Sequence, residues 1–137
     1  MEKCDAFQGF QVFCGVGCST GVGFLSYLYE LLDCYNPPAI HAYALYPSTK
    51  NSTRLFEPCN AVVATQYLRE ITSTVCVLEN EAIANICKSH LNVKRPSYSD
   101  LNGVIAELVS GVTSSMRFGG ALNEELSEMK ENLVPYD

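Results

Sequence analysis

The 137-residue sequence lacks three features that would each indicate a class of protein. No apolar run approaches the ~20 residues that a membrane-spanning helix needs, so we expect no membrane among its partners. No lysine and arginine cluster is interleaved with aromatic residues, and the formal net charge is −6. A nucleic-acid partner, which requires a basic face, is therefore not expected. Because 47% of the residues are hydrophobic and only 18% are charged, the composition is typical of a folded domain.

Cysteine is plentiful, but its spacing is not that of a metal site. The seven cysteines form no C-x-x-C pair, and the only histidines are His41 and His90. We therefore predict no metal-binding residues. The first ten residues, MEKCDAFQGF, contain one lysine and no apolar core of a signal peptide. An odd number of cysteines without a signal peptide indicates buried, reduced thiols in a cytoplasmic protein.

Strand-like apolar runs alternate with helical patterns along the chain. Strands are expected at 7–14, 40–46 and 74–78. Helices are expected at 20–34, from Glu57 through the sequence EPCNAVVATQYL, at 79–91, at 97–118 and within 123–133. Up to the helix at 97–118 the order is β-α-β-α-β-α-α, which predicts an α/β fold in which parallel strands are joined by crossover helices.

The clearest helical pattern begins after Pro96. Ser97 and Asp100 have the spacing of a capping box. Seven apolar residues then recur at i, i+3 and i+4 spacing: Leu101, Val104, Ile105, Leu108, Val109, Val112 and Met116. The pattern predicts one helix to about Phe118, roughly 30 Å long, which Gly119-Gly120 ends.

The stretch FQVFCGVGCSTGVGF, residues 10–24, leads from a predicted strand through small residues into a helix. Such a turn can cradle phosphate, carry a nucleophile, or simply connect the two elements. Residues 17–21 fit the G-x-S-x-G elbow of hydrolases, but that reading needs a suitably placed acid and histidine after the serine. Only two histidines exist and none follows Asp100. The phosphate cradle and the ligand-free helix start therefore remain as alternatives.

Four motifs spread over the chain resemble those of the tubulin family, and the alpha-tubulin type most closely. EPCN resembles the family's E-P-Y-N, and NEAIANIC resembles N-E-A-I-Y-D-I-C. RPSYSDLN resembles R-P-T-Y-x-x-L-N. The stretch SSMRFGGALNEELSEMKENLVPY resembles the end of the family's long central helix and the start of its second domain. The order and spacing of the four motifs carry the resemblance.

The resemblance implies a partial doubly wound, Rossmann-like parallel sheet of the tubulin and FtsZ GTPase type. Residues 1–118 would be part of the GTPase domain, including the central helix at 97–118. Residues 119–137 would begin the intermediate domain. The family's early strands, first phosphate loops and magnesium-holding acid have no counterpart before Met1, so the chain is expected to be an internal fragment.

The family's phosphate loop, roughly G-G-G-T-G-S-G, aligns with residues 17–23. The resemblance implies phosphate contacts from Gly17, Thr20 and Gly21. Two of the family's glycines are replaced by Cys18 and Ser19. A side chain costs on the order of 1 kcal/mol or more where the backbone needs a positive φ or must closely approach phosphate.

The remaining GTP contacts are also implied by the resemblance. Ribose contacts would come from two residues near the start of the second helix, where a carboxylate can accept bonds from two hydroxyls. The guanine would be read by asparagine amides and stacked on a tyrosine, with a leucine beside them. The implied residues are Thr53 and Glu57 for the sugar, and Asn80, Tyr98, Leu101 and Asn102 for the base.

Glu128 matches the alpha-type catalytic glutamate, which would act in trans on the GTP of the next subunit. The resemblance thus implies a beta-tubulin-like partner, the microtubule lattice and a cytoskeletal location in the cytoplasm. Two functions follow. One is a GTP-binding structural constituent of microtubules, inactive as a GTPase when isolated. The other is a tubulin-derived remnant or interaction piece without competent nucleotide binding.

Overall fold

The computed structural model describes residues 4, 7–48, 54–119, 125–134 and 136. Three strands, β1 (Phe10–Gly15), β2 (Ile40–Tyr46) and β3 (Thr74–Glu79), form one parallel sheet in the order β1-β2-β3. Phe10 is paired with Ile40, and His41 is paired with Thr74. The expected parallel α/β sheet is confirmed.

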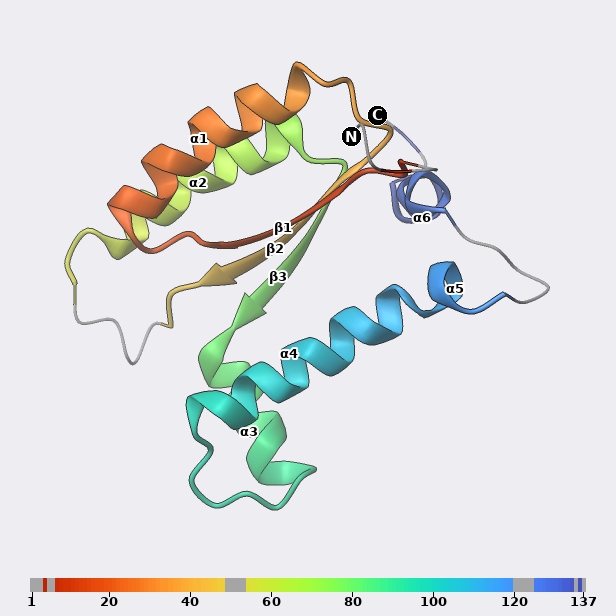
Figure 1. Cartoon of the computed structure of the whole chain (residues 1–137). Helices are drawn as coiled ribbons and strands as arrows, with labels where there is room; N and C mark the ends of the chain where they lie inside the picture. Colours follow the sequence, from red (N-terminus) through yellow and green to blue (C-terminus); the bar gives the residue numbers. More distant parts are fainter. Residues whose placement is uncertain (1–3, 5–6, 49–53, 120–124, 135, 137) are drawn as a thin grey trace.

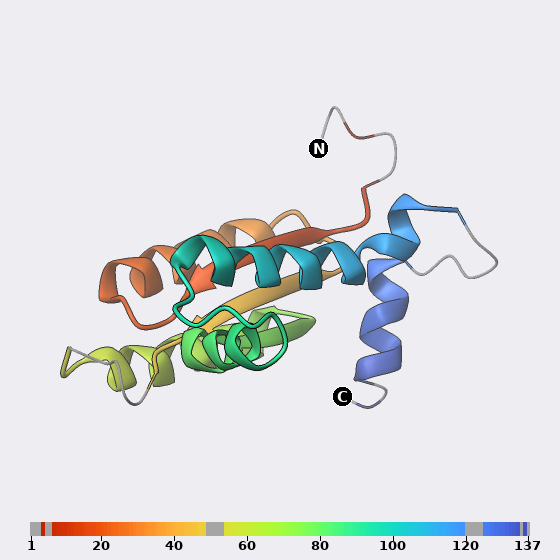
Figure 2. The same cartoon turned by 90° about the horizontal axis from the view of Figure 1, so that it is seen from below.

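Helices cover both faces of this sheet (Figure 1). The crossover helices α1 (Ser19–Asp33) and α2 (Glu57–Ile71) lie side by side on one face. On the other face, α3 (Asn80–Ser89) packs against α4 (Tyr98–Val112). Figure 2 shows the layers from below, with α6 (Leu126–Leu133) at one end of the sheet. The three layers place the strand ends between helices from both faces.

The larger hydrophobic core lies between the sheet and the pair α1 and α2. Alternate residues of β2, among them Ile40, Ala42 and Ala44, point to this face because side chains alternate along a strand. Leu25 and Leu68 are buried against them from the two helices. β2 is buried on both faces, as is usual for the central strand of a parallel sheet.

A second, smaller core joins the opposite face of the sheet to α3 and α4. Tyr43 and Leu78 contribute from the strands, Ile83 and Cys87 from α3, and Leu101 from α4. The helical spacing of Ile83 and Cys87 places both on the face of α3 that is buried. This cluster holds the beginning of α4 close to the end of β3.

The predicted helix at 97–118 is only partly correct. Its beginning is confirmed, because the Ser97 amide donates to the Asp100 carboxylate at 2.8 Å and the Asp100 amide donates to Ser97 Oγ at 3.4 Å. However, α4 ends at Val112, and a separate turn, α5 (Ser114–Arg117), follows. Several side-chain hydroxyls bond to preceding carbonyls at this break, including Thr113 to Val109 at 2.9 Å, and such bonds bend helices.

The predicted burial of the thiols is wrong for most of the cysteines. All seven are free, but Cys87 alone is buried. Cys14 and Cys76 are half-buried, and Cys4, Cys18, Cys34 and Cys59 are exposed.

Within the described part of the chain, no helix combines the length and the apolar character needed to cross a bilayer.

Candidate functional site

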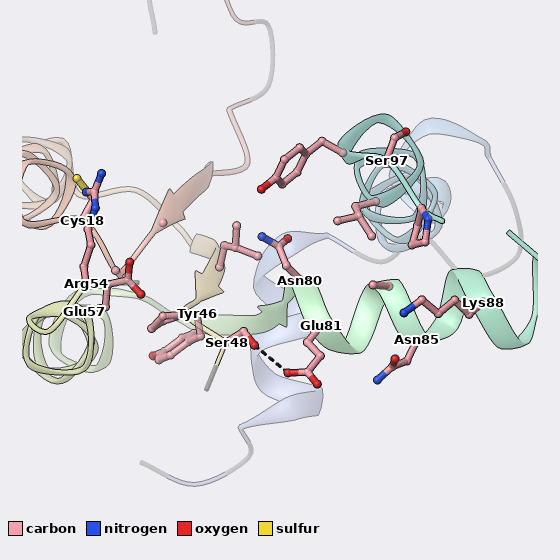
Figure 3. Close-up of a pocket in the computed structure, with 18 residues that line it drawn as sticks. Cys18, Tyr46, Ser48, Arg54, Glu57, Asn80, Glu81, Asn85, Lys88 and Ser97 are labelled. Carbon is pink, nitrogen blue, oxygen red and sulfur yellow. Dashed lines mark hydrogen bonds between the residues drawn. The ribbon is translucent and has the colours of Figure 1, made fainter. Parts of the chain in front are cut away.

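Four helices begin around one open cleft of about 880 Å³ at the carboxyl ends of the strands (Figure 3). The residues at or beside these helix starts that line the cleft are Cys18 for α1, Glu57 for α2, Asn80 for α3 and Ser97 for α4. The amino end of a helix carries partial positive charge and unpaired backbone N–H groups. Four such ends around one cleft favour a bound anion.

The start of α1 forms one wall of the cleft. Gly17 and Cys18 line it, whereas the predicted contacts Thr20 and Gly21 lie in the first turn of α1 and do not. Cys18 has an extended backbone with φ −102°. Neither Cys18 nor Ser19 has a positive φ. Replacing the family's glycines with these residues therefore causes no backbone strain at this turn.

The thiol of Cys18 lies at the α1 start and uses backbone N–H groups of the kind that bind anions at helix starts. The backbone N–H groups of Gly21 and Thr20 donate to it, and together with the charge of Arg54 they hold its pKa below the ordinary value. The sulfur is exposed. A thiolate is thus favoured at the helix end, for the same reason that an anionic ligand would be.

Glu57 begins α2 directly across from Gly17. A Cβ placed on Gly17 would lie 3.6 Å from Cγ of Glu57, which measures how closely the two elements approach. Asn60 Nδ2 donates to the Gly17 carbonyl at 3.1 Å and fixes this approach. Arg54 lies on the same side of the cleft (Figure 3). Thr53, the other predicted sugar contact, lies outside the described residues.

The opposite wall contains three of the four residues predicted for the base. Asn80, Tyr98 and Leu101 line the cleft. The Tyr98 side chain is 77% exposed, so its ring is available for stacking, while Leu101 is buried. Asn102 does not line the cleft; it lies in a separate groove along α4. The structure therefore brings together Gly17, Glu57, Asn80, Tyr98 and Leu101, but not Thr20, Gly21 or Asn102.

Several cleft residues were missed by the sequence analysis. Ser48, which is nearly buried, donates from Oγ to Glu81 Oε2 at 2.8 Å and links the end of β2 to α3 (Figure 3). Lys88 adds a cation from the last turn of α3. The spacing of Lys88 from Asn80 could have indicated Lys88, since eight residues are about two helical turns and place both side chains on a similar face of α3. Nothing in the sequence indicated Ser48.

Glu128 lies on α6, away from the cleft. It is exposed, and its carboxylate accepts the Glu125 backbone N–H at 3.3 Å in a capping box. Glu128 therefore caps its own helix. Among the described residues, no group of three or more histidine, cysteine, aspartate or glutamate side chains could hold a metal ion.

The profile of the Tubulin/FtsZ family, GTPase domain, matches residues 1–88. These residues contain the three strands described above and three of the four helix starts that line the cleft. The chain belongs to the Tubulin/FtsZ family.

Curated tubulins match almost the whole chain. The nucleomorph tubulin alpha chain of Guillardia theta is 45% identical over 137 residues, which are 99% of this chain and 31% of that protein. The tubulin alpha-2B chain of Physarum polycephalum is 44% identical, covering 98% and 30%. The tubulin alpha-4 chain of Drosophila melanogaster is 43% identical, covering 98% and 29%. The chain thus spans about 30% of the length of these relatives.

Proposed function

We propose that the cleft binds a guanine nucleotide, GTP, and that the chain is a tubulin-like structural constituent of the microtubule cytoskeleton in the cytoplasm. The convergence of four helix amino ends on one cleft is the observation that carries this proposal. A nucleoside triphosphate offers the negative charge that such a convergence favours. The membership in the Tubulin/FtsZ family supports the same choice.

The side chains of the cleft fit a guanine nucleotide at the base and the sugar. The Asn80 amide has both a donor and an acceptor for the edge of the base, and the exposed Tyr98 ring can stack on it. The Glu57 carboxylate can accept bonds from the two ribose hydroxyls. The triphosphate would bring the anionic charge and its magnesium ion to the α1 start.

The catalytic part of the proposal depends on a neighbouring subunit. Glu128 would orient water at the nucleotide of the next subunit, so the isolated chain is expected to show no turnover. The partner would be a beta-tubulin-like chain in a microtubule lattice. We further propose that residues 1–118 form the nucleotide-binding part and that 119–137 belong to a second domain.

The alternative function is a tubulin-derived interaction piece that does not bind nucleotide. One observation favours it: at the α1 start, the N–H groups of Thr20 and Gly21 are directed to the Cys18 thiol. A nucleotide phosphate would have to replace that thiol or bind beside it. Under this alternative, nucleotide would leave the stability of the chain unchanged.

A thermal melt followed by circular dichroism, with and without GTP and magnesium, separates the two functions. Ligand at 100 times its dissociation constant stabilises a protein by about 2.7 kcal/mol, which raises Tm by several degrees. Asn80→Ala should weaken binding about tenfold, since it removes a hydrogen bond to the base. Asn132→Ala, on α6 outside the cleft, is the matched control. A Tm that GTP does not change would rule out nucleotide binding and support the alternative function, an interaction piece without nucleotide.

A further inference from the structure

Ser48 is a polar residue of the cleft that the proposed nucleotide contacts do not use. Its side chain is nearly buried, and Oγ donates to Glu81 Oε2 at 2.8 Å. Tyr46 pairs with Glu79 at the last position of the parallel register between β2 and β3. Ser48 and Glu81 each follow that pair by two residues, so the strand register brings them together. The bond therefore joins the segment after β2 to the first turn of α3.

The first turn of α3 begins without a side-chain cap. Its N-cap residue, Glu79, has an extended backbone and makes no side-chain capping hydrogen bond. Such a bond usually stabilises the start of a helix. The residues that bury α3 against the sheet, Ile83 and Cys87, lie further along the helix. The bond from Ser48 to Glu81 thus connects the rest of the fold to the turn that lacks a cap.

Asn80, the residue proposed to read the base, lies in this same turn. It is the first residue of α3, and Glu81 is the second. Figure 3 shows the two side chains leaving α3 in different directions, with that of Glu81 towards Ser48. Within the described part of the chain, no hydrogen bond holds the Asn80 amide itself. Its direction therefore depends on the position of the turn that carries it.

We propose that Ser48, acting through Glu81, positions Asn80 for the guanine base and so raises the affinity for GTP without touching the nucleotide. The inference rests on the proposed function of the cleft. An amide that bonds to the edge of a base needs a fixed orientation, because hydrogen bonds weaken steeply as their angles close. When the Ser48 hydroxyl is removed, the first turn of α3 is free to shift, and Asn80 binds the base less well.

A direct contact between Ser48 and the nucleotide fits the structure less well. The side chain lines the cleft, but it is only 8% exposed, and its hydroxyl proton is directed to Glu81. A nucleotide would have to break this bond in order to gain another of the same kind. Ser48 is therefore a positioning residue.

A double-mutant cycle tests whether Ser48 acts through Asn80. The affinity of the whole chain for GTP with magnesium is measured by isothermal titration calorimetry. Ser48→Ala should weaken binding about fivefold, and Asn80→Ala about tenfold. The combined variant should bind about as weakly as Asn80→Ala alone, because a residue that acts through Asn80 has no effect once Asn80 is absent.

Two further variants serve as controls. Ser48→Thr keeps the hydroxyl and should bind GTP within about twofold of the unchanged chain. Ser89→Ala removes an exposed hydroxyl at the other end of α3, where Oγ donates to Asn85 O at 2.8 Å, and should leave binding unchanged. Circular dichroism melts confirm that each variant is folded.

A measurement without nucleotide tests the positioning itself. Two-dimensional NMR of the ligand-free chain resolves side-chain amide signals, and Asn80→Ala identifies that of Asn80. This signal should shift or broaden in Ser48→Ala and stay unchanged in Ser89→Ala. An Asn80 signal that Ser48→Ala leaves unchanged would overturn the inference, whatever GTP does.

The calorimetry separates failure of this inference from failure of the proposed function. If the unchanged chain does not bind GTP, the proposed function fails, and the role of Ser48 in GTP binding fails with it. If GTP binds but the two substitutions add to a loss of about fiftyfold, the proposed function stands and Ser48 acts independently of Asn80. Binding by Ser48→Thr that is as weak as that of Ser48→Ala would also overturn the inference, because the hydroxyl would not be the group that acts.

Discussion

Gly9 and Ala39 approach each other so closely that no side chain fits at position 9. A Cβ on Gly9 would lie 2.2 Å from the carbonyl oxygen of Ala39, and φ of Gly9 is +145°. Glycine alone adopts such a φ without strain. The contact lies directly before β1, where the Phe10 amide bonds to that same carbonyl oxygen. Gly9 therefore allows β1 to begin pairing with β2.

Gly9→Ala should lower the free energy of unfolding by about 2 kcal/mol or more, because both the φ and the Ala39 contact become strained. Gly23→Ala is the control: it lies inside α1, and nothing lies within 4 Å of the added methyl. That variant should stabilise by about 0.5–1 kcal/mol. Urea unfolding measures both, and equal effects of the two substitutions would contradict the role assigned to Gly9.

Tyr29→Phe should raise the stability of the chain. Tyr29 is fully buried in the larger core, and its hydroxyl has no hydrogen-bond partner among the described residues. Burial, with Cys14 nearby, also raises the pKa of Tyr29. Removing an unsatisfied hydroxyl and keeping the ring should gain about 1–3 kcal/mol. A Tm that falls on substitution would mean that the hydroxyl has a partner in solution, and Tyr27→Phe, on the exposed side of α1, is the control.

Stability should fall as the pH is lowered from 7 towards 5, because of His41. This side chain is buried at the start of β2, where it contacts the Thr74 hydroxyl and makes a backbone hydrogen bond with Leu126. Burial lowers the pKa of His41, and the Leu126 bond opposes this only in part.

The direction of this pH dependence follows from the different proton affinities of His41 in the folded and the unfolded chain. Below the unfolded-state pKa of about 6.5, the unfolded chain binds a proton that the folded chain does not. The contribution of His41 to the free energy of unfolding is complete above that pKa. It decreases as the pH falls below it, by at most about 1.4 kcal/mol per pH unit. Urea melts of the chain and of His41→Asn, compared across this range, measure the difference. A slope that the substitution leaves unchanged would assign the effect to other groups.

Cys18 should be the fastest cysteine to react with iodoacetamide at neutral pH. The two backbone N–H groups at the α1 start and the charge of Arg54 lower its pKa, and its sulfur is exposed. Thiolate, the reacting form, is therefore more abundant than in an ordinary thiol. Peptide mapping after brief labelling measures the order of reaction, and Cys34, exposed at the other end of α1, is the comparison.

Nucleotide should also slow the labelling of Cys18. If GTP binds in the cleft as proposed, its phosphates lie at the α1 start, so GTP with magnesium should protect this thiol and leave Cys34 unaffected. Equal protection of both would indicate a general change in the fold. Labelling of Cys18 at an unchanged rate in saturating GTP would place the phosphates elsewhere.

The regular part of the fold could be predicted from the sequence because local signals agreed with it. Ile40 to Tyr46 reads as a buried strand and is one, and Ser97 with Asp100 gives the start of α4. The end of α4 could not be predicted, because the apolar spacing continues past Val112 to Met116. The helix ends instead where the hydroxyls of Thr113 and Ser114 bond to preceding carbonyls.

The site was predictable only where residues lie at the ends of strands and the starts of helices. Glu57, Asn80 and Tyr98 meet in the cleft because each lies at the start of a helix. Asn102 follows Tyr98 by one turn, but it lines the separate groove along α4. Whether a helical side chain faces the cleft depends on how the helix packs against the sheet. The motif RPSYSDLN carries no information on that packing.

The pairing of β2 with both of its neighbours has a consequence for how fast the chain folds. Phe10 pairs with Ile40 and His41 pairs with Thr74, so each pair joins residues about 30 positions apart in sequence. Closing a loop of that length has an entropic cost, and the part of this cost that depends on loop length is roughly 3 kcal/mol. The chain meets this cost before any strand pairing stabilises it. Helices α1 and α2 can form locally and shorten these loops. The sheet should therefore form late and slowly, after its helices, with β2 as the strand on which both closures depend.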